Sequence, residues 1–313
     1  MVMTAVLPTQ NSSKKNDEAV TTIALLVKKN GISQSLFSRY WRDVHGVLAA
    51  RIPGFESYLQ FHLDEPLQDV EMTVKTATAA IGRSVKFDGI AEVLYEKEQD
   101  RAGLATSAVA ALIQEDERNV FQTSLLYNLA PGASRTYVDR LAQDGKPDAE
   151  RPEAASAFLL VGRRPEQAGA DTVGAIESTL LPALLDRAGV LKLRSHVLIS
   201  GDPHWWSPAG VEHAQTPETT FDVAIQIVCQ DQSSLAACLT EVFSAVGATL
   251  FQSIGNVHVY PIRAAYRMVD AGRPTQLGLR GLDVMQTIDA IGADNQRQDA
   301  VLNCIYGISA SAS

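Results

Sequence analysis

The pattern of hydrophobic and polar positions in the first 130 residues predicts a strand–helix–strand–strand–helix–strand unit. After an initial apolar run, Ser33 is a suitable N-cap for a helix in which apolar residues recur every three or four positions. An alanine-rich stretch over about 101–114 predicts the second helix. Apolar runs or alternation predict strands at 21–27, 55–63, 87–95 and 122–129. This order is that of a ferredoxin-like α+β fold.

The second half of the chain repeats this order of elements. A helix interrupted by Pro182 is predicted over about 172–187, and another over about 233–246. Matching residues recur at a separation of 134: Leu25-Leu26-Val27 as Leu159-Leu160-Val161, His62 as His196, Phe87-Asp88 as Phe221-Asp222, and Glu92 as Gln226. We therefore predict a tandem duplication with a divergent second copy. At this separation His45 corresponds, loosely, to Thr179.

These patterns divide the chain into five segments. The connector is expected because its residues are polar and include Pro and Gly. The extension lies outside the repeat, and we predict a short helix in it and one further strand at 300–308. The expected segments are a disordered N-terminal arm (1–19), a first ferredoxin-like domain (20–130), a connector (131–156), a second, divergent ferredoxin-like domain (157–269) and a C-terminal extension (270–313).

Composition and charge narrow the range of functions. Hydrophobic residues make up 46% and charged residues 20%, which is typical of a globular protein with a sizeable core. The net charge of -9 argues against a nucleic-acid partner. No apolar run reaches the roughly 18 residues of a membrane helix, and the N-terminus has no stretch typical of a signal peptide. The three cysteines form no recognised pair, so we expect a cytoplasmic protein with neither nucleic-acid nor membrane partners.

Several motifs in the first copy occur together in one known family. They are FSRYWRDVHG (Phe37–Gly46), the turn Arg51-Ile-Pro-Gly-Phe55, the predicted strand FDGIAEVLY (Phe87–Tyr95), and Asp116 followed by Phe121. Over roughly 21–129 the chain resembles the EthD family of the dimeric α/β-barrel superfamily. The second copy keeps Phe221-Asp222 but lacks the other motifs.

The resemblance implies an architecture and a range of chemistry. Two antiparallel sheets of one chain would face each other as a barrel, with clefts between sheets and helices and only one full cleft. A homodimer of such pseudo-dimers is compatible with it. Activities in related families include accessory functions in ether catabolism, polyketide cyclisation, dehydration, decarboxylation, lactone isomerisation, monooxygenation and haem chemistry. Fold alone therefore does not select a function.

His45 is the leading candidate for chemistry. It borders the apolar stripe of the predicted helix, and Tyr40 and Trp41 lie one turn before it. A neutral imidazole can accept or donate a proton near neutral pH, and the aromatic residues could form a wall for a planar substrate. A histidine at a helix edge that bonds a backbone carbonyl would explain the pattern equally well.

Polar residues on the predicted strands form a second candidate group. Alternation places Tyr58, Gln60 and His62 on one face, and we expect them to point into the barrel with Asp88 and Glu92. Arg194, His196, Asp222 and Gln226 would face them from the second copy. A His–Asp pair could orient an imidazole. Mutual hydrogen bonding across the interface between copies is the stronger interpretation, because both copies keep the His and the Asp.

The loop from Ser200 to His213 is the third candidate. Trp205 and Trp206 could form a lid over an apolar ligand, or simply pack. His204 and His213 do not have a recognised metal-ligand spacing. His258 and Tyr260 share a face of the last predicted strand and are expected to reach the second cleft. GxSxG and GxGxxG motifs are absent.

Together these features predict a cofactor-independent lyase- or isomerase-type enzyme with no metal. It would catalyse dehydration, cyclisation, decarboxylation or isomerisation, by proton transfer, on a hydrophobic aromatic or polyketide-like small molecule. One alternative is a non-catalytic small-molecule-binding or accessory protein of a catabolic pathway, and another is a haem- or metal-dependent oxidative enzyme. The expected catalytic residues are His45, Asp88 and Glu92, and the expected substrate contacts are Tyr40, Trp41, Tyr58, Gln60, His62, Trp205, Trp206, His258 and Tyr260.

Overall fold

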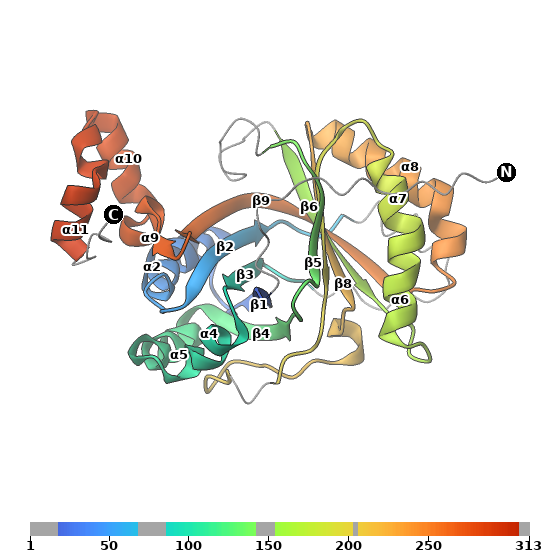
Figure 1. Cartoon of the computed structure of the whole chain (residues 1–313), viewed down its shortest axis with the longest axis horizontal. Helices are drawn as coiled ribbons and strands as arrows, with labels where there is room; N and C mark the ends of the chain where they lie inside the picture. The colour runs from blue at the N-terminus through green and yellow to red at the C-terminus, as the bar shows by residue number, and fades with distance from the viewer. Residues whose placement is uncertain (1–17, 68–85, 142–153, 203–205, 307–313) are drawn as a thin grey trace.

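The computed structural model describes residues 18–67, 86–141, 154–202 and 206–306 (Figure 1). It has an α+β fold in which two four-stranded antiparallel arrays have the same strand order. The first array, β4-β1-β3-β2, consists of β1 (Val20–Lys28), β2 (Phe55–Leu63), β3 (Gly89–Tyr95) and β4 (Phe121–Asn128). The second, β9-β6-β8-β7, consists of β6 (Ala155–Gly162), β7 (Val190–Val197), β8 (Val223–Cys229) and β9 (Asn256–Asp270). This confirms the ferredoxin-like fold that the sequence predicts.

The two arrays are joined at both edges. Strand β9 is 15 residues long; its first part pairs with β6 and its second part with β2 of the other array. At the opposite edge the chain leaves β4, turns at Gly132, whose φ is 75°, and continues as β5 (Ser134–Asp139), which pairs with β7. The arrays therefore face each other around an enclosed interior.

Aromatic and aliphatic side chains from both arrays fill this barrel interior. Phe61 packs edge-on against Phe158 with 5.0 Å between ring centroids, and Phe87 packs against Phe221 at 6.1 Å. Tyr260 belongs to the same buried cluster. Burial of this apolar surface between the sheets is what holds the two halves face to face.

Helices cover the outer face of each array (Figure 1). The first array is covered by α1 (Gln34–Tyr40), the π-helical turn η1 (Trp41–His45), α2 (Gly46–Ala49), α4 (Glu98–Gly103) and α5 (Ala108–Val120). The second is covered by α6 (Gly169–Ala175), the π-helical turn η5 (Ile176–Leu180), α7 (Leu181–Leu185) and α8 (Gln232–Leu250). Within the described ranges α8 alone is long and apolar enough to span a membrane, but its residues Leu235, Leu239 and Val242 are buried in the protein core.

The strand register corrects the residue matches expected between the copies. Strands β3 and β8 do correspond at a separation of 134 residues, but His62 pairs with Gly89 whereas His196 pairs with Ala224, the counterpart of Ile90. The counterpart of His196 is therefore Phe61, at a separation of 135. A shift of one residue exchanges the two faces of a strand. The expected equivalence of His62 and His196 is wrong for this reason.

The same one-residue shift applies to the first strands and the first helices. Leu25 pairs with Ile90, and Leu160, not Leu159, pairs with Ala224. The turn η1 likewise corresponds to η5 at a separation of 135, so the counterpart of His45 is Leu180 and not Thr179.

Three elements differ from the sequence predictions. The expected connector contains β5, which supplies the edge partner of β7. The helix predicted over 101–114 is divided, because Ser107 caps α5 through the N–H of Ala110. The strand predicted at 300–308 is helical through its described part, α11 (Asp299–Tyr306). No β-strand of the described residues lies beside it, and Leu302 buries one side of the helix.

The C-terminal extension continues from β9 through β10 (Arg273–Pro274) into α9 (Gln276–Arg280), α10 (Leu282–Ile291) and α11. Arg51 holds α9 by donating to the carbonyl oxygens of Gly278 and Leu279 at 2.6 and 3.2 Å. Asp43 caps the start of α10 by accepting from the N–H of Leu282 at 2.8 Å. These helices therefore pack on the helical layer of the first half, at one end of the molecule (Figure 1).

Candidate active site

A cavity of about 320 Å³ lies between the outer face of the first array and its covering helices. Small side chains on the sheet, Ala24 and Ala91, form its floor, and aromatic side chains including Trp41 and Phe121 form its walls. Charged and polar side chains are few among its lining residues. An apolar cavity of this size with a few convergent polar groups is the usual setting of a small-molecule site.

The second half differs at the corresponding positions that the structure describes. Larger apolar side chains are buried there in one core cluster: Leu159 in place of Ala24, Ile225 in place of Ala91 and Leu180 in place of His45. The expectation of one full cleft agrees with this packing.

The local helix geometry directs Trp41 and His45 toward the cavity. Ser33 accepts from the N–H of Leu36 at 3.2 Å, which confirms the N-cap that the sequence predicts. The helix then widens into the π-turn η1, in which the N–H of Gly46 bonds the carbonyl of Trp41. Such a turn inserts an extra residue into the helix, and π-turns are frequent at functional sites.

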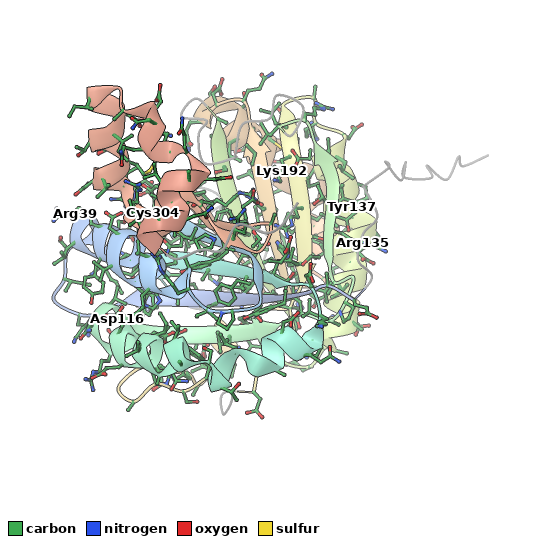
Figure 2. The ribbon with its side chains drawn as sticks, turned by 60° about the vertical axis from the view of Figure 1, so that its left-hand side comes forward. Arg39, Asp116, Arg135, Tyr137, Lys192 and Cys304 are labelled. Carbon is green, nitrogen blue, oxygen red and sulfur yellow. The ribbon has the colours of Figure 1, made fainter. Side chains whose placement is uncertain are left out.

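His45 is held by a partly buried carboxylate on α5. Its Nδ1 lies 3.0 Å from Oδ2 of Asp116, and Tyr40 donates to Oδ1 of the same residue at 2.6 Å. The ring of His45 is buried and stands edge-on to Phe121 at 5.2 Å. Its Nε2 has no hydrogen-bond partner among the described residues, and His45 lines the cavity. Figure 2 shows Asp116 on α5, next to the helix that carries His45.

The bonds to Asp116 determine its charge. Burial raises the pKa of this carboxyl, but the hydrogen bonds from His45, Tyr40 and Asn119 outweigh burial and lower the pKa to about 2. Asp116 is therefore ionised near neutral pH, and an ionised carboxylate accepts a hydrogen bond from Nδ1–H. This leaves Nε2 of a neutral His45 as the basic nitrogen.

Glu117, the next residue on α5, also lines the cavity and is buried. Its Oε1 accepts from the indole N–H of Trp206 at 2.7 Å, whereas its Oε2 is buried without a hydrogen-bond partner. Burial raises the pKa of Glu117, and the neighbouring His45 opposes this rise. Trp206 comes from the loop after β7, so the second half of the chain completes the wall of the cavity.

Sequence reasoning did not select Asp116 or Glu117 as site residues, although Asp116 is part of the family motif. A signal for Glu117 was present in the sequence. It shares the buried face of α5 with Ala110, Ile113 and Val120, at helical spacing. A carboxylate on an otherwise apolar stripe is costly to bury, which makes such a residue a candidate for function.

The expected position of Tyr58, Gln60 and His62 inside the barrel is wrong. Tyr58 lines the cavity, and its hydroxyl accepts from Gln60 at 2.9 Å. Gln60 also donates to the carbonyl of Trp41, and the His62 ring packs against the Trp41 ring, tilted by 31° with 4.4 Å between centroids. All three side chains therefore face the helical layer, where they support Trp41.

Asp88 and Glu92 do not line the cavity. Asp88 accepts from the backbone N–H of Lys28 at 2.9 Å, and the corresponding Asp222 accepts from that of Arg163 at 2.8 Å. This repeated bond ties the start of β3 to the end of β1 and the start of β8 to the end of β6. Glu92 lies inside the barrel, 2.6 Å from Arg194.

The remaining candidates divide between the interior and the loop. His258 and Tyr260 do not reach the helical side of the second array, because both pack with Phe221 and Phe87 inside the barrel. His213 bonds the carbonyl of Ser124 at 2.9 Å. Trp206 lines the cavity, as the lid hypothesis expects, whereas His204 and Trp205 lie outside the described residues.

Gly89→Ala is expected to disturb this wall and to lower the free energy of unfolding by about 1–3 kcal/mol. A β-carbon at Gly89 would lie 2.4 Å from Cζ3 of Trp41, so the indole must move. Gly174→Ala is the control, since no atom lies within 4 Å of its added carbon. Urea unfolding measures both variants. Equal stability of the two would contradict the close packing of Trp41.

Comparison with known proteins finds one domain family. Residues 29–124 match the EthD domain. Among curated protein sequences, none matches the chain. The matched region, residues 29–124, contains His45, Asp116 and Glu117 but excludes β1 and Trp206.

Several solved structures are similar at low sequence identity. A protein from Fusobacterium nucleatum subsp. nucleatum, provisionally named a monooxygenase, has 7% identity and a TM-score of 0.48, covering 82% of this chain and 96% of its own. An anthrone oxidase-like protein has 11% identity and a TM-score of 0.46, covering 80% and 93%.

Proposed function

Since residues 29–124 match the EthD domain and contain a His–Asp pair whose histidine is buried, we propose that the chain is an enzyme that moves a proton on a hydrophobic small molecule. One observation carries this proposal: Nε2 of His45 is the nitrogen left unpartnered by the bond to Asp116, and His45 lines an apolar cavity. Lyase- or isomerase-type reactions, such as dehydration, cyclisation, decarboxylation or isomerisation, use such a base.

His45 would act as the general base. Asp116 fixes the ring and stabilises the imidazolium that forms when Nε2 takes a proton from carbon. The mostly apolar lining suits a hydrophobic substrate, whose C–H bond can approach Nε2 of His45. The pair therefore supports removal of a C–H proton next to a carbonyl group.

The polar groups of the cavity indicate the shape of the substrate. His45 and Phe121 lie at the Leu26 end of β1, whereas Thr22 and Asn128 lie at the other end, bonded to each other at 3.0 Å. Thr22 and Leu26 are four residues apart on one strand, which is a distance of about 13 Å. We therefore propose a flat molecule of two or three fused rings with an oxygen at each end.

The test is hydrogen–deuterium exchange, followed by NMR in D₂O, at C2 of 1-tetralone, which is next to the carbonyl, and at the C10 methylene of anthrone, which is conjugated to the carbonyl through the aromatic rings. Wild-type protein is expected to accelerate the exchange, and His45→Ala to lower the rate by about 10²- to 10⁴-fold. Glu177→Gln is the control, because Glu177 is an exposed residue of the second half and does not line the cavity. An unchanged rate in a folded His45→Ala protein would rule out the assigned role. Binding of both ketones without exchange would favour a non-catalytic binding protein.

A further inference from the structure

We propose that Glu117 is the proton donor of this site and that Trp206 positions it. The proposal rests on the proposed function of His45, and it assigns to Glu117 the transfer of a proton to the substrate oxygen that becomes negative. The two groups are on different elements, η1 and α5, and both line the same cavity.

The first argument is the unbalanced hydrogen bonding of Glu117. With Oε1 bonded to Trp206, its Oε2 is a buried polar atom without a partner. Among the described residues, no Lys, Arg or His forms an ion pair with Glu117. A buried carboxyl oxygen left unpaired costs about 1–3 kcal/mol, and such an atom calls for a functional explanation. An oxygen atom of a bound substrate would satisfy it.

The second argument is the set of charges around Glu117. His45 and His213 favour its ionised form, whereas Asp116 disfavours it, and burial dominates the outcome. Tyr58 faces it from β2 with a phenol whose pKa is raised to about 12 by burial, so this neighbour stays neutral. The raised pKa favours the protonated form of Glu117, and a protonated carboxyl is a hydrogen-bond donor and a general acid.

The third argument is the way the second half holds Trp206 in place. The loop that carries it runs along β4, where the N–H of Gly201 bonds the carbonyl of Leu126 and the N–H of Glu212 bonds that of Gln122, both at 2.8 Å. These backbone bonds fix the indole over α5. A matched EthD domain alone would supply Glu117 without the donor that orients it.

The step balances for an aromatic ketone. Nε2 of His45 takes the proton from the carbon next to the carbonyl, and the electron pair of that C–H bond forms a C=C bond. The carbonyl π pair moves to oxygen, which receives the proton of Glu117, giving the enol, a carboxylate and an imidazolium. For isomerisation His45 returns the proton to a different carbon. For exchange the imidazolium first trades this proton for a deuteron of the solvent, and the transfers then run in reverse, so that His45 returns a deuteron to carbon.

The experiment compares Glu117→Gln with wild type in the exchange of 1-tetralone over a range of pH. Glutamine keeps the shape and still accepts from Trp206, but it has no acidic proton. We expect the rate to fall about 10²-fold. In wild type the rate should also decline at high pH as Glu117 ionises, and this decline should vanish in the variant. Glu115→Gln, an exposed change on the same helix, is the control.

Trp206→Phe provides a second variant. The bond from Trp206 lowers the pKa of Glu117, so its loss should move the alkaline decline of the exchange rate to higher pH. If Glu117 served only in packing, Trp206→Phe would not change the pH at which the exchange rate declines. Carbon-13 NMR of labelled glutamate, with Glu117→Gln to assign the signal, should show Glu117 titrating above the ordinary value of 4.5.

The outcomes separate the two proposals. Loss of exchange in His45→Ala with wild-type rate and pH profile in Glu117→Gln would overturn the role of Glu117 and leave that of His45. Titration of Glu117 at or below its ordinary value would overturn the donor role even if exchange is lost. Absence of exchange in wild type would overturn both.

Discussion

Replacing Glu92 with glutamine is expected to lower the free energy of unfolding by about 3 kcal/mol, because it leaves a guanidinium inside the barrel without its counter-charge. Glu92 belongs to β3 and Arg194 to β7, so their 2.6 Å ion pair crosses the interior between the two arrays. Burial raises the pKa of Glu92, but the charge of Arg194 outweighs it and the pKa is lowered. This loss of about 3 kcal/mol is at the lower end of the range that is usual when one partner of a buried ion pair is removed, since 18% of the Arg194 side chain is exposed.

Two further variants test that explanation. Glu98→Gln breaks an ion pair with Arg101 in which Glu98 is half exposed, and it should cost less than about 1 kcal/mol. Adding Arg194→Leu to Glu92→Gln should restore most of the lost stability, because the uncompensated charge is removed. Leu59 is the counterpart of Arg194 in the first array. Urea unfolding measures all three proteins, and no recovery in the double variant would contradict the electrostatic explanation.

The second large effect is an expected loss of stability as the pH falls below about 6.5. Burial and the charge of Arg194 lower the pKa of His196 to about 3, and burial with Arg263 and Arg42 lowers the pKa of His62 well below 6.5. Between pH 6.5 and these lowered pKa values, the unfolded chain therefore binds a proton at each of the two histidines, whereas the folded chain does not. Each histidine then costs about 1.4 kcal/mol of stability per pH unit, or about 2 kcal/mol between pH 6.5 and 5.

His196→Phe isolates this effect. Phenylalanine occupies the corresponding position 61 and cannot take up a proton. The raised pKa of Glu117 acts in the opposite direction, so the comparison of slopes between variant and wild type is the informative measurement. Urea unfolding at several pH values should show a shallower decline for His196→Phe. Parallel curves for the two proteins would show that His196 does not titrate on unfolding.

The sequence was sufficient to predict the fold class, because period-two and helical patterns directly reflect which side of an element is buried. It also selected His45, Tyr40 and Trp41, since a polar residue at the edge of an apolar stripe is visible in one dimension. The faces of β2 could not be assigned in the same way. Both faces are buried, one by the barrel interior and one by helices, so alternation between Phe61 and His62 does not distinguish them.

Contacts between distant segments account for the rest of the site. Trp206 and Glu117 are 89 residues apart in sequence, and their bond depends on a loop of the second half reaching β4. The separation of 134 residues was also misleading. β3 and β8 correspond at this separation, but the elements before them, β1 with β6 and β2 with β7, correspond at a separation of 135. A difference of one residue is enough to exchange the faces of a strand.

The exchange of edge strands between the arrays determines how this chain can be divided. β9 supplies a hydrogen-bonded partner to β2, and β5 supplies one to β7. If the chain were cut between β5 and β6, each fragment would keep an edge strand that the other requires, and the two should assemble as a complementing pair. The region that matches the EthD domain also lacks β1, the strand between β3 and β4. The smallest autonomous folding unit therefore includes both halves of the chain, and the boundaries of the matched family are not boundaries of folding.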